Sequence, residues 1–274
     1  MQTIPNLELH VAHGCNLSCE SCSHYSNQGH KGMLSLAEAE DWMRQWAGRL
    51  APRTLSLLGG EPSIHPQLPA FLELARRYFP KTHLRLVTNG FFLHRHPELP
   101  AVMARDPDAC LDLSVHHDSP EYREKLEPIY GLLKSWVAQH GIRVQVYLSH
   151  KRWTRRYHGS GSAMAPFDDG QPRRSWEHCP AKHCMQLHQG QLWKCAPLAY
   201  LHMQDDKYGL SDAWAPYLAY RPLAAGCSDA ELAQFAGREH EDACGMCPAR
   251  PERLALPYPL KTAAALRAVG IEAE

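Results

Sequence analysis

The amino-acid sequence predicts an α/β fold built on a parallel sheet or partial barrel, and two observations support this prediction. Short apolar runs typical of strands alternate with amphipathic segments typical of helices, as expected of right-handed crossovers between parallel strands. Polar residues gather just after several predicted strands, at the edge where α/β proteins build active sites. Together these observations indicate an enzyme.

The predicted elements follow one another in order along the first 150 residues. A strand at Leu7–Val11 leads into a cysteine-rich loop, and Ser35 with Glu38 forms a capping box for a helix whose apolar residues recur at helical spacing. Ser119 is the expected cap of a later helix. The other predicted strands are 54–58, 83–87, 110–115 and 143–149, and the other predicted helices are 67–79 and 121–139.

Composition narrows the class of protein. The 274 residues suit one large domain with a small appendage, and 29 basic residues balance 29 acidic ones, so charge does not favour nucleic acid or an anionic membrane as a partner. The sequence shows neither an apolar run long enough to span a bilayer nor a signal peptide. These features predict a cytoplasmic protein, whose ten cysteines stay reduced and serve mainly as metal or cluster ligands.

Three cysteines, Cys15, Cys19 and Cys22, lie in a CxxxCxxC loop directly after the first predicted strand. Three thiolates leave a tetrahedral metal or a cubane cluster one ligand short, so the fourth position belongs to a distant residue or to a bound molecule. A zinc site with His13 or His24 as the fourth ligand is one interpretation. Zinc does not account for the Gly-Gly-Glu-Pro sequence that follows the second predicted strand.

The cysteine loop and this Gly-Gly-Glu-Pro sequence together resemble the radical S-adenosylmethionine (SAM) enzymes. In that family the three cysteines hold a 4Fe–4S cluster, and the fourth iron binds SAM. One electron then cleaves SAM to a 5′-deoxyadenosyl radical that abstracts hydrogen from the substrate. The resemblance covers about Leu7–Val146 and implies a partial (β/α)6 barrel, in which 153–157 is a possible sixth strand.

The resemblance also implies which residues contact SAM. Glycines after the second strand would let backbone carbonyls approach its ammonium group. The family usually carries an aromatic residue just before the third cysteine to pack on adenine; Ser21 stands there in this chain, and Tyr25 is the expected substitute. The full set implied for SAM is Gly59, Gly60, Glu61, Pro62, Thr88, Asn89, Ser114, His116 and Tyr25.

Later cysteines surround a predicted hairpin at Gly190. Their arrangement resembles the twitch subdomain, the shortened form of the SPASM extension, which holds one auxiliary 4Fe–4S cluster. A structural zinc ribbon is the alternative, and Cys184 could replace Cys179 as a ligand. The implied ligands are Cys179, Cys195, Cys244 and Cys247.

The chain therefore divides into three predicted parts. Residues 1–150 form the radical SAM core, and 151–178 form a polar linker that is either disordered or lines a substrate pocket. Residues 179–274 form a small β-hairpin and helix subdomain for the auxiliary cluster, which ends in a helix at 260–269.

Two further cysteines and one arginine are candidates for catalysis. Cys184 or Cys227 could return hydrogen to a substrate radical, as free cysteines do in radical epimerases, whereas Cys110 reads as an inert core thiol. Cluster layout is similar to that of superfamily members that oxidise an aminocyclitol alcohol. This likeness implies a substrate-binding arginine after the fifth strand, chosen from Arg152, Arg155 and Arg156, of which Arg152 is our candidate.

The function predicted from the sequence is that of a radical SAM oxidoreductase or epimerase. Its substrate would be a small polar molecule such as a sugar, aminocyclitol or nucleoside, its cofactors two 4Fe–4S clusters and SAM, and its electron donor a flavodoxin or ferredoxin. Two alternatives remain open. One is a maturase that modifies a peptide, although such enzymes usually carry a peptide-docking domain before the barrel; the other is a non-catalytic zinc or Fe–S binding module.

Overall fold

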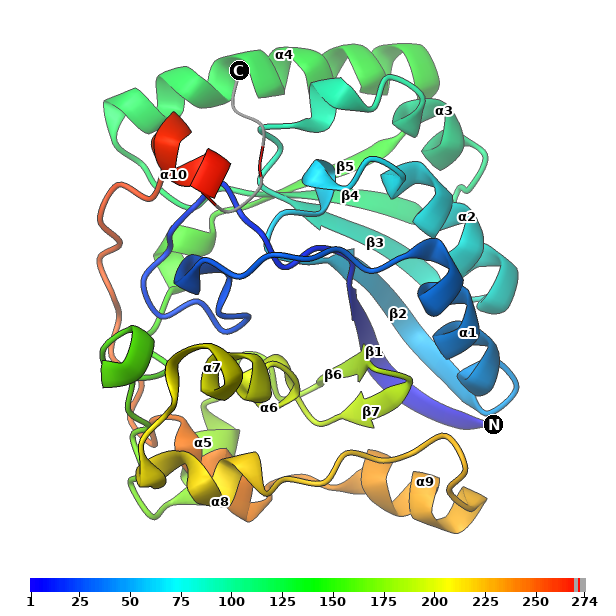
Figure 1. Ribbon diagram of the computed structural model, residues 1–274. Coiled ribbons are helices and arrows are strands. Elements are labelled where there is room, and N and C mark those ends of the chain that lie inside the picture. Colours follow the sequence, from blue (N-terminus) through cyan, green and yellow to red (C-terminus); the bar gives the residue numbers. More distant parts are fainter. Residues whose placement is uncertain (269–270, 272–274) are drawn as a thin grey trace.

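The computed structural model describes residues 1–268 and 271 (Figure 1). Within these residues seven strands form one sheet in the order β5-β4-β3-β2-β1-β6-β7, and all neighbours are parallel except β6 and β7. The predicted α/β partial barrel is therefore confirmed. The strands are β1 Gln2–His10, β2 Leu50–Leu58, β3 His83–Thr88, β4 Ala109–Ser114, β5 Arg143–Tyr147, β6 Cys184–His188 and β7 Gln191–Trp193.

Four helices, α1 Leu36–Trp46, α2 Leu68–Tyr78, α3 Leu99–Ala104 and α4 Pro120–His140, cover the outer face of the sheet (Figure 1). Both caps predicted from the sequence form: Ser35 and Glu38 make the full capping box of α1, and Ser119 accepts from the backbone of α4. The six-residue α3 was not predicted, because it is too short to show helical periodicity.

The later helices are short and lie mainly around the hairpin. They are α5 Pro172–Glu177, α6 Ala196–Ala199, α7 Leu201–Tyr208, α8 Ala215–Leu218, α9 Asp229–Gly237 and α10 Ala263–Ala268. The last of these corresponds to the helix predicted at 260–269, of which residue 269 lies outside the described residues.

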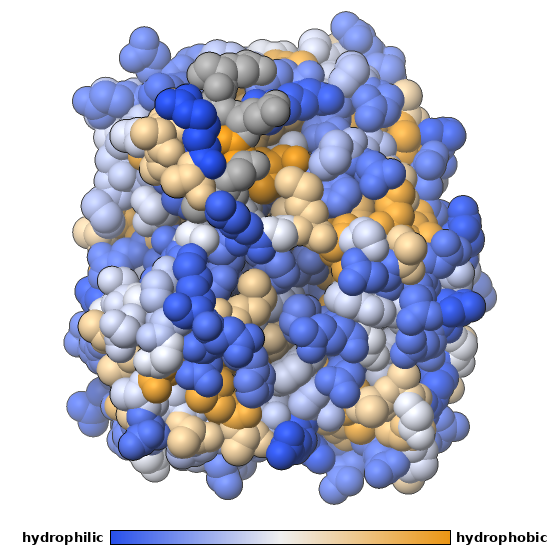
Figure 2. Space-filling view, in the orientation of Figure 1, coloured by the Kyte–Doolittle hydropathy of each residue, from blue (hydrophilic) through white to orange (hydrophobic). Residues whose placement is uncertain are grey.

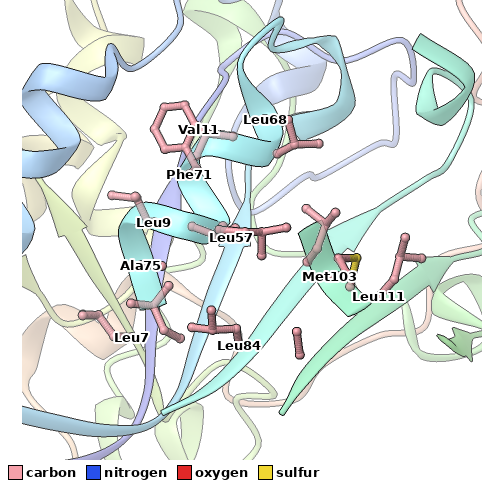
Figure 3. Close-up of a cluster of buried hydrophobic side chains, with 14 of the residues drawn as sticks. Leu7, Leu9, Val11, Leu57, Leu68, Phe71, Ala75, Leu84, Met103 and Leu111 are labelled. Atoms are coloured by element: carbon pink, nitrogen blue, oxygen red, sulfur yellow. The ribbon is translucent and has the colours of Figure 1, made fainter. Parts of the chain in front are cut away.

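The hydrophobic core fills the space between the sheet and its outer helices. Figure 3 shows Leu7 and Leu9 of β1 and Leu57 of β2 close to Phe71 and Ala75 of α2. Successive residues of a strand point to opposite faces, so the residues between these leucines lie on the inner face of the sheet. Several residues on this inner face are polar and still buried, namely Glu8, His10, Ser56, Asp112, Gln186 and His188.

The hairpin predicted around Gly190 is confirmed, but its place in the sheet was not foreseen. Its first strand, β6, pairs in parallel with β1, so that Met185 is the partner of Leu7. The sixth strand predicted at 153–157 is wrong: there Thr154 forms just an isolated bridge with Arg253. The sixth parallel strand is β6, and it extends the sheet at the β1 edge rather than at β5.

None of the helices in the described residues is both long and apolar enough to span a membrane. On the face shown in Figure 2, hydrophobic residues lie in small groups among hydrophilic ones.

Candidate functional site

A cavity of about 200 Å³ lies at the carboxyl ends of β1, β2, β3 and β4. The cysteine loop after β1 forms one wall, and the residues that follow the other strands form the rest. Ten of the predicted SAM or cluster residues meet here, among them Thr88 at the end of β3 and Ser114 at the end of β4. The others are Cys15, Cys19, Cys22, Gly59, Gly60, Glu61, Asn89 and His116.

The two glycines hold the cysteine loop against the end of β2. Gly60 donates its N–H to the carbonyl of Ala12 at 2.7 Å, and Glu61 donates to the carbonyl of Gly14 at 2.9 Å. A Cβ atom at Gly60 would lie 2.2 Å from the Gly14 carbonyl oxygen. Glycine is therefore required at position 60 because the backbone of the cysteine loop approaches it closely. From the sequence we expected that the approach of a bound ligand would require it.

Glu61 is fully buried, and protein donors occupy its carboxylate. It accepts from the Ser63 N–H at 2.9 Å, from the Asn89 N–H at 2.7 Å and from the Thr88 hydroxyl. Burial raises the pKa of this carboxyl, and these hydrogen bonds oppose the rise. Glu61 thus ties the end of β2 to the end of β3 and shapes the cavity wall. Pro62 follows it at the start of a buried turn.

Asn89 and His116 contact the cysteine loop directly. The Asn89 side-chain amide donates to Asn16 Oδ1 at 2.7 Å and lies 3.8 Å from Cys15 Sγ. His116 Nδ1 lies 3.6 Å from Cys19 Sγ. Burial lowers the pKa of His116 to about 4, so its ring is neutral near pH 7. Both side chains therefore border the three thiols.

The three thiols have unequal electrostatic surroundings. Burial raises the pKa of Cys15 to about 12 and also raises that of Cys19. Burial would do the same to Cys22, but hydrogen bonding and charge from His24 outweigh it and lower the pKa. Burial likewise opposes protonation of His24, yet Cys22 and Glu8 raise its pKa to about 9. His24 lines the cavity beside Cys22, whereas His13 is not among the lining residues.

Tyr25 is not placed to pack on adenine, and this correction has a clear structural basis. Its side chain is fully buried among Tyr157 and neighbouring apolar residues, and its hydroxyl donates to the Pro197 carbonyl at 3.1 Å. Tyr25 is absent from the cavity lining. The aromatic side chain that does line the cavity is Trp153, which the sequence did not single out.

Ser21 explains how Trp153 comes to the cavity. Its hydroxyl oxygen accepts from the backbone N–H of Arg156 at 2.6 Å and from that of Tyr157 at 3.2 Å. The Trp153 indole donates to the Glu20 carbonyl at 2.7 Å. The segment after β5 is thus attached to the cysteine loop, and these bonds occupy backbone donors that a strand at 153–157 would need.

The second group of cysteines lies beside a second cavity, of about 330 Å³. Cys179 follows α5, Cys195 caps α6 after the hairpin, and Cys244 and Cys247 lie in and after a short turn at Asp242–Met246. Burial raises the pKa of Cys195, and the charges of the other three thiols raise it further. Cys179, Cys195 and Cys247 line this cavity, and Cys244 is joined to Cys247, whose N–H donates to the Cys244 carbonyl at 3.3 Å.

The remaining thiols lie elsewhere. Cys184 begins β6 opposite Asn6, whose amide donates to its sulfur at 3.6 Å. The Cys227 carbonyl accepts from Arg49 at 2.7 Å, next to the amino end of β2. Neither residue lines either cavity, so the hydrogen-donor role predicted for them finds no support. Cys110 is buried, as expected of a core thiol.

The segment after β5 lines the second cavity with two of its three arginines. Arg155 forms an ion pair with Glu20 at 2.6 Å and is not part of the lining. Arg152 and Arg156 both line the cavity. The two cavities share Ser23, Ser149 and Trp153, so they adjoin one another. The two groups of thiols therefore border neighbouring cavities.

The donor sets fit Fe–S chemistry in different ways. Three thiols around an open cavity leave a coordination position for a bound molecule, whereas four gathered thiols can complete a cluster. No group of three or more His, Cys, Asp or Glu side chains in the described residues is arranged to hold a single metal ion. A cubane cluster makes a different demand, because each thiolate binds a separate iron.

An α/β partial barrel with three cysteines at its strand ends is the architecture of an Fe–S enzyme core, and comparison with known proteins identifies the family. Residues 9–135 form a radical SAM domain, because they match the family model described as the Radical SAM superfamily. Members of that superfamily are enzymes, and such a domain implies one 4Fe–4S cluster and SAM. A search of curated proteins found no match.

Solved structures extend the likeness beyond this region. BtrN, crystallised in complex with AdoMet and 2-DOIA, matches with a TM-score of 0.52 and 17% identity over 94% of this chain and 99% of that chain. At this identity the likeness concerns the fold. The anSMEcpe structure with bound AdoMet and Cp18Cys peptide matches at 0.39 and 17% identity, over 53% of this chain and 42% of that one. SuiB from Streptococcus suis, bound to the precursor peptide SuiA, matches at 0.38 and 12% identity, over 80% and 67% of the two chains.

Proposed function

We propose that this protein is a radical SAM oxidoreductase that removes hydrogen from a small polar substrate. The observation that carries this proposal is the adjacency of two cysteine-bordered cavities, one with three thiols and one beside four. Cys15, Cys19 and Cys22 would hold the cluster that binds SAM. Cys179, Cys195, Cys244 and Cys247 would hold an auxiliary cluster, in the manner of a twitch subdomain.

Each set of residues would contribute differently to the reaction. When bound, the cofactors would supply two things: one electron, which cleaves SAM to methionine and a 5′-deoxyadenosyl radical, and a four-thiolate cluster that can accept an electron from the substrate. Asn89 and His116 would position the cysteine loop, and Glu61 would keep the strand ends in register around SAM. Trp153, shared by both cavities, would separate SAM from bulk water and border the substrate.

Oxidation is favoured over epimerisation by where the spare thiols lie. An epimerase of the kind considered needs a thiol beside the substrate, and neither Cys184 nor Cys227 lines either of the two cavities described above. An alcohol that loses one hydrogen atom, one electron and one proton becomes a carbonyl. The hydrogen atom would leave with 5′-deoxyadenosine, the electron would go to the auxiliary cluster, and the proton would pass to solvent. A flavodoxin or ferredoxin would supply the electron that starts each turnover.

Reductive cleavage of SAM tests this proposal directly. Anaerobically reconstituted wild-type protein with dithionite and SAM should form 5′-deoxyadenosine and methionine. Changing Cys15, Cys19 and Cys22 together to Ala should abolish both products, while about four irons per chain remain on the other thiols. Cleavage that persists in the triple variant would show that the first cysteine group does not bind the reactive cluster.

A further inference from the structure

The second cavity carries two guanidinium groups that lack a carboxylate partner. Arg152 and Arg156 line it, and within the described residues neither side chain forms an ion pair. The Arg152 guanidinium instead lies over the Tyr147 ring, 5.9 Å from its centroid. No Asp or Glu is among the lining residues. The positive charge at this cavity is therefore not balanced by an acidic side chain of its wall.

The arginine between them, Arg155, does have a carboxylate partner. Arg155 lies outside the lining, and Glu20 neutralises it through an N–O contact of 2.6 Å. Of three arginines within five positions, the one away from the cavity is paired and the two at the cavity are not. This selective pairing suggests that the unpaired groups serve a bound molecule.

Thr154 provides a second, independent observation. Its hydroxyl oxygen is buried and has no hydrogen-bond partner, and the residue lines the same cavity. Buried polar atoms without a partner are uncommon in proteins. The backbone here is also fixed, because Arg156 donates its N–H to Ser21 at 2.6 Å. Rotation of the Thr154 side chain would turn this hydroxyl into the cavity, where a ligand with several oxygen atoms would satisfy it and meet the guanidinium groups.

Part of this positive charge faces the second cysteine group. Arg156 and Cys247 both line this cavity. A cluster on the four thiolates would therefore use some of the Arg156 charge. The Arg152 guanidinium, which lies over the Tyr147 ring, remains for the substrate.

We propose that this cavity binds a substrate that carries a carboxylate or phosphate group, held by Arg152 and Arg156 with a hydrogen bond to Thr154. This inference rests on the proposed function and narrows its substrate class. Guanidinium groups bind both anions in a forked, charge-assisted geometry, and they repel the ammonium group of an aminocyclitol. A cluster on Cys179, Cys195 and Cys247 would fill part of the cavity of about 330 Å³, and the space beside Arg152 and Arg156 would remain for a small molecule. The substrate would thus be an acidic or phosphorylated sugar-like molecule.

Four probes with the same ring test the proposal by calorimetric titration of the reconstituted protein with SAM present. They are glucose, glucose 6-phosphate, glucuronate and glucosamine. At least one anionic probe should bind roughly tenfold or more tightly than glucose, as one charge-assisted hydrogen bond typically provides. Glucosamine should bind more weakly than glucose. The tighter of the two anionic probes identifies phosphate or carboxylate as the group recognised.

Matched variants assign the preference to individual residues. Arg152→Gln and Arg156→Gln should each reduce the anion preference by roughly tenfold, whereas Arg155→Gln should preserve it. Iron content and the unfolding midpoint show whether each variant is folded and loaded. Equal affinity for all four probes, or no binding of either anionic probe, overturns the proposal. SAM cleavage by the same wild-type sample separates the two hypotheses, because its absence refutes the proposed function and its presence without an anion preference refutes this inference alone.

Discussion

The first cysteine group lies in one loop, between residues 15 and 22, whereas the second is assembled from three segments between residues 179 and 247. Neighbours along the chain place the first group at the end of β1. The second group depends on a helix, a hairpin and a late turn that must pack together; Ser175 of α5, for example, donates to the Cys247 carbonyl at 2.9 Å. A motif that is local in the sequence thus places the first cysteine group, whereas tertiary packing places the second.

The first cysteine group also depends on contacts with segments that are distant in the sequence. The cysteine loop is attached to the end of β2 through Gly60, to β3 through Asn89 and to the segment after β5 through Ser21. The segment near the C-terminus covers it as well, since Lys261 donates to the Cys15 carbonyl at 2.7 Å. A motif that is local in sequence therefore still relies on distant contacts for its position.

The largest expected effect comes from removing one thiol of the second group. Cys195→Ala should lower the iron content of anaerobically reconstituted protein from about eight to about four per chain, because a four-thiolate cluster loses a ligand. Cys184→Ala is the matched control and should keep about eight irons, since its thiol accepts from the Asn6 amide and does not line the second cavity.

Iron and acid-labile sulfide analysis would check this comparison. An unchanged iron content in Cys195→Ala would remove that residue from the ligand set. A loss of iron in the Cys184→Ala control would instead restore the alternative in which Cys184 replaces Cys179.

A smaller effect is expected at the contact between β2 and β3. Glu61→Gln replaces one carboxylate oxygen by an amide NH₂ group that faces donors such as the Asn89 N–H. The free energy of unfolding should fall by about 1.5–3 kcal/mol, the range for hydrogen bonds to a charged group. Urea unfolding of the wild-type and variant proteins measures this change. A variant as stable as wild type, but with weakened SAM binding, would return Glu61 to a direct role toward the cofactor.

A gradual effect, spread over a range of pH, concerns the buried histidines on the inner face of the sheet. Burial lowers the pKa of His188 to about 4, so the unfolded chain binds a proton more readily than the folded one between about pH 4 and 6.5. The stability that the buried neutral His188 ring contributes is therefore present above about pH 6.5 and is lost as the pH falls toward about 4. His188 alone should contribute about 1 kcal/mol per pH unit in this window.

Urea unfolding at several pH values compares wild type with His188→Gln. The variant should lose less stability on acidification, because glutamine does not titrate. Parallel pH dependences for the two proteins would contradict the assignment to His188.

The sequence by itself determined the α/β class, most strand and helix positions, and the first group of cysteines. It could do so because alternation of leucine with polar residues, capping boxes and closely spaced cysteines are local signals. The SAM family was recognisable for the same reason, since its loop and the Gly-Gly-Glu-Pro sequence each lie within a few residues.

Tertiary structure decided what local patterns do not contain. The pairing of β6 with β1 joins residues far apart in the chain, and sequence alternation does not specify which edge a strand extends. The direction of a side chain is equally hidden, so Tyr25 was expected at the cavity while Trp153 occupies it. Glu61 looked like a ligand for SAM until its three protein partners, all brought there by neighbouring strand ends, accounted for its buried carboxylate. Packing and hydrogen bonding between distant segments set these features, because a buried polar group takes whichever partners the fold places beside it.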